Sequence, residues 1–238
     1  MSGGSIFDLS LLTFIFVTLA YYIYKFVYYK KFFNIDNSSD FNESYSKNRK
    51  RLYIFIVSVL MAMFNFLSLK NACGGNMLNN IGTYISSLVP IFVVFILVIQ
   101  LITFLPGWKA PFSNTFGYLI TKLMGLSRVY QSLLKDPKDQ SEKIKQLLET
   151  AISDKSILIN EFTPSNMNKQ LKELGGLFKL NDIAKINNFK KLIILKDYVS
   201  EFIWYVLSGV LTIFISANTI SQASCSAELS KEGSKLKE

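Results

Sequence analysis

The sequence predicts an all-α, polytopic membrane protein with four transmembrane helices and a helical membrane-external region between the third and fourth spans. Half of the 238 residues are hydrophobic and the mean hydropathy is +0.29, which is too apolar for an ordinary soluble domain of this length. The apolar residues gather in four continuous runs, and the long stretch between the last two runs keeps helical spacing. These observations together favour a helical membrane protein.

Each of the four runs is close to the length that crosses a bilayer as a helix, about 20 residues. They cover residues 6–24, 52–69, 85–105 and 202–220. Their apolar residues are continuous rather than alternating, which favours helices over the strands of a barrel. No Lys or Arg lies within them; Asn65 and Gln100 lie deep, which is more typical of polar contacts between helices than of an ion path.

These spans divide the chain into segments with different expected roles. In order, they are an N-terminus with the first transmembrane helix (1–24), a basic cytoplasmic-side loop (25–51), a transmembrane hairpin of the second and third spans (52–105), a Pro- and aromatic-rich loop followed by a helical membrane-external region (106–201), the fourth transmembrane helix (202–220) and a polar flexible tail (221–238). The tail is rich in Ser and Lys and has no apolar periodicity, so we expect it to be flexible.

Positive charge orients these spans in the membrane. The loop between the first two spans is rich in Lys and Arg, whereas no Lys or Arg precedes the first span. Because positive loops tend to stay on the cytoplasmic side, the loop at 25–51 and the region at 106–201 are expected to be cytoplasmic. The positive residues of that loop are Lys25, Lys30, Lys31, Lys47, Arg49, Lys50 and Arg51.

The membrane-external region is expected to be mostly helical. Apolar residues recur at three- and four-residue steps over 117–135 and again over 139–154. The run at 156–162 has some strand character, and Ser165 is a candidate N-cap for a short helix after it. The last amphipathic stretch, from residue 181, is predicted to continue into the fourth span as one long helix.

The residue types give no expectation of catalysis. The chain has no histidine, which removes the most common general base and most zinc and haem sites. Its acids are scattered and its glycines lack the spacing of a nucleotide-binding loop, so we expect no enzyme, catalytic residue, metal, cofactor or small-molecule substrate. The net charge of +9 is not gathered in a stripe with stacking aromatics, so no nucleic-acid partner is expected.

Two cysteines, Cys73 and Cys225, are the only ones in the chain. The expected topology places both on the non-cytoplasmic side, where a disulfide could form. Two unrelated thiols are the alternative, and the sequence leaves both open.

The stretch FLPGWKAPFSNTFGY, residues 104–118, follows the third span directly. An interfacial aromatic belt explains its Trp, Tyr and Phe residues. A loop stiffened by two prolines also suits docking on a protein partner, since little conformational entropy is left to lose. Both interpretations stay open, and the candidate docking residues are Pro106, Trp108, Pro111, Phe112, Asn114 and Tyr118.

This motif, read as LPGWKAPFSNTFGYLI after a span in a chain rich in Lys, Asn, Ile and Phe, resembles the multi-pass inner-membrane or minor capsid proteins of nucleocytoplasmic large DNA viruses, the giant viruses. The resemblance implies a structural virion protein that anchors the viral inner membrane to the icosahedral capsid shell. Its partners would be the lipid bilayer and the major and other minor capsid proteins, and its location the virion inner membrane, assembled on host endomembrane. An oligomeric channel or transport subunit is the alternative function.

Overall fold

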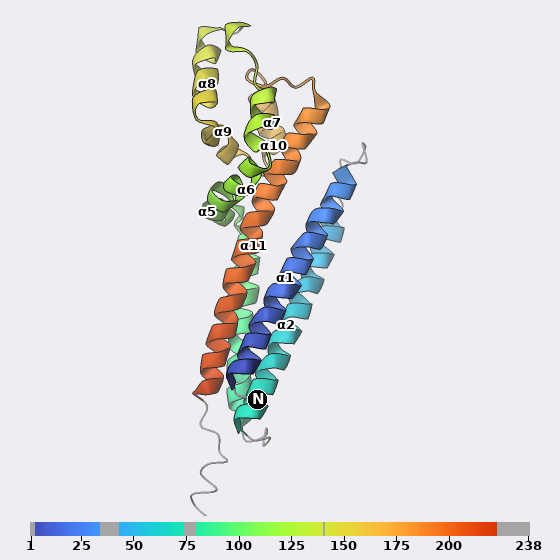
Figure 1. Cartoon of the computed structure of the whole chain (residues 1–238), viewed down its shortest axis with the longest axis vertical. Helices are drawn as coiled ribbons and strands as arrows, with labels where there is room; N and C mark the ends of the chain where they lie inside the picture. The colour runs from blue at the N-terminus through green and yellow to red at the C-terminus, as the bar shows by residue number, and fades with distance from the viewer. Residues whose placement is uncertain (1–2, 34–42, 74–79, 140, 223–238) are drawn as a thin grey trace, which may run out of the picture. The chain divides into compact units, whose positions relative to one another are not determined.

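The computed structural model describes residues 3–33, 43–73, 80–139 and 141–222 (Figure 1). These residues form helices and connecting turns, and their only β-type pairing is one isolated antiparallel bridge between Leu134 and Phe178. The predicted all-α class is confirmed. The helices fall into two compact units: a membrane unit (Met1–Tyr24, Asn37–Leu105 and Trp204–Glu238) and an external unit (Lys25–Asp36 and Pro106–Ile203).

Four helical segments are long and apolar enough to cross a membrane, as predicted. The first two are α1 (Gly3–Phe33) and α2 (Glu43–Cys73). The third is built from α3 (Ile81–Pro90), a π-helical stretch η2 (Ile91–Ile96) and α4 (Leu97–Phe104), and the fourth lies within α11 (Ile183–Ser221). The π-helical stretch begins directly after Pro90, where the missing N–H interrupts the regular ladder. The protein is therefore a four-span helical membrane protein.

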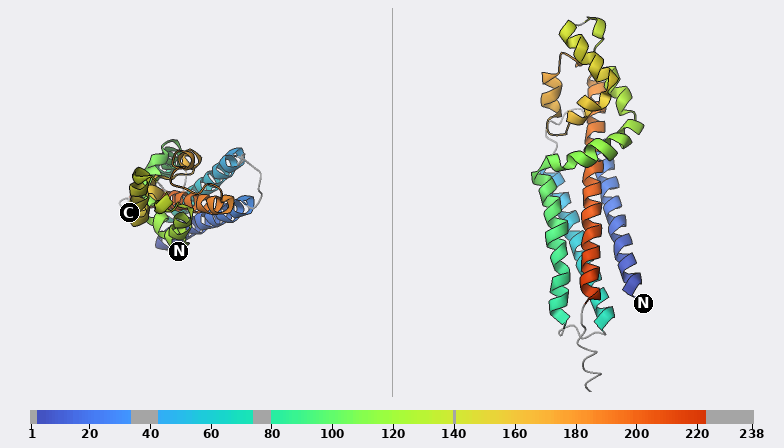
Figure 2. Two further views of the ribbon diagram at one scale, coloured as in Figure 1. Left: turned by 90° about the horizontal axis from the view of Figure 1, so that it is seen from above. Right: turned by 90° about the vertical axis from the view of Figure 1, so that its left-hand side faces the viewer.

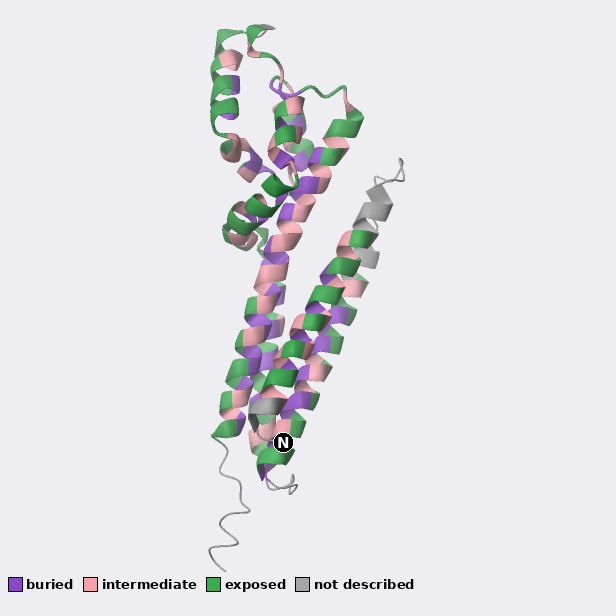
Figure 3. Cartoon of the chain, in the orientation of Figure 1, coloured by how far each residue is buried: buried purple, intermediate pink, exposed green. Residues whose placement is uncertain are grey.

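In the membrane unit large apolar side chains are exposed and several polar side chains are buried, as expected in lipid; Figure 3 colours the chain by burial. Phe16 and Phe55 are exposed, whereas Asn65, Ser87 and Ser216 are buried. The Asn65 side-chain amide donates to the Ser87 carbonyl at 2.8 Å, and the Ser216 hydroxyl donates to the same carbonyl at 2.9 Å. These bonds join α2, α3 and α11, so Asn65 serves contact between helices, as its position in the sequence indicated.

An aromatic cluster packs α1, α2 and α11 together within the membrane unit. The ring of Tyr53 is stacked on Tyr21 at 4.3 Å and on Tyr205 at 5.7 Å, measured between centroids. The hydroxyls of Thr18 and Tyr53 lie 2.8 Å apart. Such ring pairs add about 0.5–1.5 kcal/mol beyond the burial of their area, so this cluster fixes three helices against one another.

The external unit is a set of short helices around one core. Its members in chain order are η3 (Pro106–Lys109), α5 (Ala110–Phe112), η4 (Ser113–Gly117), α6 (Tyr118–Leu123), α7 (Leu126–Leu133), η5 (Pro137–Asp139), α8 (Glu142–Ser153), α9 (Lys155–Glu161), α10 (Met167–Glu173) and the first part of α11. Figure 2 shows these helices in two further views. The core includes Tyr130, Phe162, Phe178, Phe189 and Ile193, all nearly inaccessible to solvent. Burying each such side chain contributes about 1.5–3 kcal/mol, so the unit has a folded core of its own.

Several local expectations were wrong. Most of the run at 156–162 is helical, as part of α9 (Lys155–Glu161), because the Asp154 side chain accepts from the Ser156 backbone N–H and caps the helix. The helix expected over 117–135 breaks at Gly125, whose φ of 94° lies in the left-handed region that favours glycine. The N-cap position before α10 is Asn166 and not Ser165.

The remaining predictions concern the basic loop, the tail and the helix that enters the fourth span. The basic loop at 25–51 is largely helical in its described part, because α1 continues to Phe33 and α2 begins at Glu43. Residues 34–42 and 223–238, which include most of the predicted tail, lie outside the described residues. The single long helix expected before and through the fourth span is confirmed as α11.

Candidate docking site

The predicted docking loop is helical rather than a loop. Residues 106–123 form η3, α5, η4 and α6 in close succession. Both prolines stand where helices tolerate them: Pro106 opens η3, and Pro111 lies in the first turn of α5. The prolines therefore start short helices, and this correction changes which residues of the segment face outward.

The six candidate docking residues divide into two groups. Pro106, Trp108 and Pro111 are exposed, and Trp108 keeps 48% of its surface. Phe112, Asn114 and Tyr118 are half-buried; Tyr118 packs on the core of the external unit. The structure thus brings only the first group to the surface as a set.

One side of this segment is lined by small residues and is fully packed. Ser113, Gly117 and Thr121 recur every four residues and are all buried. A Cβ placed on Gly117 would lie 2.5 Å from the backbone oxygen of Lys196, a distance that real Cβ atoms do not reach. The absence of a side chain at Gly117 therefore lets the segment lie directly against α11.

A buried ammonium group fixes the same contact. Lys196 is 1% exposed, and its Nζ donates to the Asn114 Oδ1 at 3.0 Å and to the Ile159 carbonyl at 3.1 Å. The carboxylates of Glu161 and Asp197 are the nearby acids that act on it. A buried charge is costly unless it is hydrogen-bonded, so Asn114 acts as an internal partner of Lys196.

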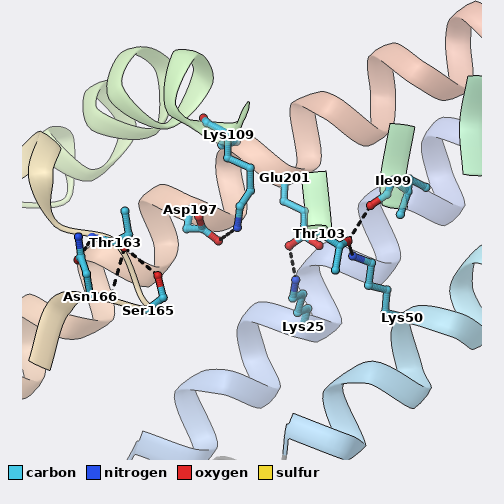
Figure 4. Close-up of polar contacts among 11 residues, drawn as sticks. Lys25, Lys50, Ile99, Thr103, Lys109, Thr163, Ser165, Asn166, Asp197 and Glu201 are labelled. Carbon is cyan, nitrogen blue, oxygen red and sulfur yellow. Dashed lines mark hydrogen bonds and ion pairs between the residues drawn. The ribbon is translucent and has the colours of Figure 1, made fainter. Parts of the chain in front are cut away.

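Two ion pairs on α11 complete what we call the charged collar: Lys25, Lys109, Asn114, Lys196, Asp197 and Glu201. Lys109 Nζ lies 2.6 Å from Asp197 Oδ2, and Lys25 Nζ lies 2.5 Å from Glu201 Oε2 (Figure 4). Lys25 also lies 4.0 Å from the centroid of the Tyr198 ring. The collar therefore joins three chain segments: the end of α1, the start of the external helices and α11.

A backbone contact reinforces the pair at Lys109. The Ser200 hydroxyl donates to the Lys109 carbonyl at 2.6 Å. The side chains of Lys109 and Asp197 keep only 18% and 14% of their surface. Because both charges are largely shielded from water, their attraction is screened less than that of a surface pair.

Sequence reasoning treated these lysines only as topology signals and missed the collar. One signal was available. Between the apolar runs at 192–195 and 202–220 stand Lys196, Asp197, Ser200 and Glu201, several of them at three- and four-residue steps. Charges in that position are rarely left unpaired, although their partners, far away in the sequence, could not be identified.

Cys73 is disulfide-bonded in the structure, and the predicted pairing with Cys225 stays a prediction. Cys73 is buried at the end of α2, in a small cluster with Leu69 and Ile220. Cys225 lies outside the described residues.

Known proteins give no further guide to this site. Comparison of the chain with models of protein families, with characterised proteins and with solved structures finds no match. The fold defines a class, a four-span helical membrane protein with a folded external unit. A function within that class has to be inferred from the geometry of the chain itself.

Proposed function

We propose that this protein is a structural membrane anchor, which holds a folded external unit at a bilayer and ties that bilayer to a protein shell. Following the resemblance of the 104–118 motif, the bilayer is the inner membrane of a giant virus particle. The shell is its icosahedral capsid, contacted through the major or other minor capsid proteins.

The observation that carries this proposal is the continuity of α11. Phe189 and Ile193 of this helix belong to the core of the external unit, and Tyr205 and Thr212 are buried in the membrane unit. One unbroken helix therefore contributes side chains to both units. A load applied to the external unit is carried into the fourth span without crossing a flexible linker, as an anchor requires.

The charged collar supports the same role. Lys25 follows the apolar run at 6–24 and Lys109 follows the run at 85–105, and both are paired with acids that precede the apolar run at 202–220. Loads are thus shared among three chain segments that lead into the membrane. A partly buried ion pair costs several kcal/mol when one partner is lost, so the collar resists separation of these segments.

A shell protein binds surfaces that face away from the core of the external unit. Helix α8 offers such a surface, because Leu147 is half-exposed and Lys143, Gln146 and Glu149 beside it are exposed. An apolar side chain within a polar rim is a common arrangement at protein interfaces. Asn114 and Tyr118 of the predicted docking loop are engaged inside the unit and are not part of this surface.

An oligomeric channel or transport subunit remains the competing function. The membrane unit contains a cavity of about 470 Å³ beside Phe7, Asn65 and Asn218. Its lining residues are apolar or neutral polar, without an ionisable side chain, whereas ion pathways usually carry one. The cavity therefore gives little support to a channel function. The charged collar gives stronger support to the anchor function.

Selective extraction of native particles distinguishes the two functions. A mild detergent that dissolves the inner membrane should leave an anchor attached to the sedimenting shell, and salt should then release it. A channel or transport subunit should leave with the lipid micelles at low salt. Recovery of the whole chain in the micelle fraction, with an intact shell in the pellet, would contradict the anchor.

A further inference from the structure

The segment from Trp108 to Met124 has an apolar face whose side chains are partly exposed in the structure. Leu123 keeps 81% of its surface, and the other large apolar side chains of this face are also exposed to a considerable degree. They are Trp108, Phe116, Leu119, Ile120, Leu123 and Met124. Such a contiguous apolar surface on a folded unit indicates an interaction site.

The spacing shows that this is one face of a helix. Phe116, Leu119, Ile120 and Leu123 recur at three- and four-residue steps, which places them together on a helix. The small residues Ser113, Gly117 and Thr121 lie on a different side and are buried. Gly117 packs directly against α11. The segment is therefore amphipathic, with one side held by protein and another side left apolar.

Chain connectivity limits how far the apolar face can lie from the end of the third span. The third span ends at Phe104, which is 76% exposed, and Leu105 is the single residue between it and Pro106. Successive Cα atoms are about 3.8 Å apart, so Trp108 lies within roughly five residue steps of the end of a transmembrane helix. A Trp at that position is typical of the membrane–water interface.

The charges of this part of the chain also suit a lipid surface. Residues 106–135 contain Lys109, Lys122, Arg128 and Lys135 but no Asp or Glu. Lys122 is exposed, and its ammonium lies 6.0 Å from the Tyr118 ring centroid. A long cationic side chain beside an apolar face can reach the headgroups while its stem stays in the apolar layer.

We propose that residues 108–124, which run from η3 through α5 and η4 to the end of α6, form an interfacial segment that follows the third span and whose apolar face is embedded in the bilayer. The occupant of this face is phospholipid, and the charged collar holds the segment in place from the protein side. An interfacial helix of this kind buries its apolar face about 5–10 Å into the headgroup and acyl boundary. This inference does not depend on the identity of any shell protein.

Tryptophan fluorescence tests the proposal, because Trp108 and Trp204 are the only tryptophans in the chain. The full chain with Trp204→Phe is reconstituted at low protein density in vesicles of phosphatidylcholine and phosphatidylglycerol. Trp108 emission should be blue-shifted and should fall about twofold or more when the lipids carry bromine high on the acyl chain. Acrylamide should quench it weakly.

Matched variants make the test specific. Leu123→Lys, in the Trp204→Phe background, should reduce the bromine quenching of Trp108, whereas Leu147→Lys on α8 should leave it unchanged. The reverse variant, Trp108→Phe, reports Trp204 in the fourth span and serves as the positive control. Far-UV circular dichroism checks that each variant keeps its helices.

Two outcomes would overturn the proposal. Emission of Trp108 at the wavelength of a water-exposed indole, with full acrylamide quenching, would show that the face is in water. Protection from acrylamide without bromine quenching, increasing with protein density, would show that a second copy of the chain covers it.

Discussion

The ammonium of Lys109 lies 2.6 Å from the carboxylate of Asp197, and this pair joins the residues that follow the third span to the helix that enters the fourth. Ser200 donates to the carbonyl of the same lysine. Asp197 and Ser200, one helical turn apart on α11, therefore hold the side chain and the backbone of Lys109. Variants at these positions test the charged collar.

Asp197→Asn should destabilise the external unit by about 1–3 kcal/mol, since it leaves the largely buried ammonium of Lys109 without its counter-charge. Chemical denaturation of the detergent-solubilised chain measures the change. Asp182→Asn is the matched control, because Asp182 lies just before α11, its partner Lys185 is only three residues away and the pair is exposed; it should have little effect. Equal effects of the two variants would show that the collar pair is no stronger than a surface pair.

Gly117→Ala should separate the segment at 106–123 from α11, because the new Cβ would lie 2.5 Å from a backbone oxygen that has no freedom to move aside. A Cβ on Gly107, in the same segment, would meet nothing within 4 Å. We therefore expect limited proteolysis to cut the segment faster in Gly117→Ala, with no change in Gly107→Ala. Identical cleavage rates in both variants would contradict the close contact.

A variant at Tyr130 should not destabilise the protein, in contrast to the variants at Asp197 and Gly117. Its hydroxyl is buried without a hydrogen-bond partner among the described residues, and burial raises the pKa of Tyr130 to about 12. Removing an unsatisfied buried hydroxyl costs little, so Tyr130→Phe should leave the free energy of unfolding at neutral pH unchanged or slightly higher. A loss of more than about 1 kcal/mol, the typical worth of a hydrogen bond, would show that the hydroxyl has a partner.

The raised pKa of Tyr130 also predicts a pH dependence. Below pH 10 both the folded and the unfolded chain keep this proton, so the group has no effect on the slope of stability with pH. Between pH 10 and about 12 the unfolded chain releases the proton and the folded chain keeps it, so the free energy of unfolding falls. The fall should be shallower in Tyr130→Phe, and equal slopes would contradict the assignment.

The Cys73–Cys225 disulfide predicted from the sequence is tested by alkylation of the unfolded, unreduced chain from its native source. Neither cysteine should react before reduction, and both should react after it. Unfolding is needed because Cys73 is buried and would be protected in the folded chain in either case. Labelling of both cysteines without a reductant would show two separate thiols.

The spans and α11 could be predicted because each depends on a local apolar pattern, as in 85–105 and in the apolar residues from Ile183 onward. Local patterns misled at 156–162, where consecutive Ile and Leu residues suggested a strand but the capping side chain of Asp154 starts a helix. The segment at 104–118 was expected to be a loop stiffened by its two prolines, whereas Pro106 and Pro111 lie at the starts of short helices.

Pairing within the collar could not be predicted in the same way. Lys25 and Glu201 are 176 residues apart in the sequence, and Lys109 and Asp197 are 88 apart. Which lysine meets which acid depends on the packing of Gly117 and its neighbours on α11, and that packing is a property of the folded chain. The sequence shows only that charges stand where an isolated charge would be costly.

The anchor function is tested most directly by lysine crosslinking with mass spectrometry on native particles. Exposed Lys143 on α8 and Lys169 on α10 are the lysines to follow, with Lys122 on the interfacial segment as the internal control. We expect links from Lys143 or Lys169 to capsid shell proteins and none from Lys122 to them. Links from all three lysines only to this chain or to its own copies would contradict the anchor and favour an oligomeric channel.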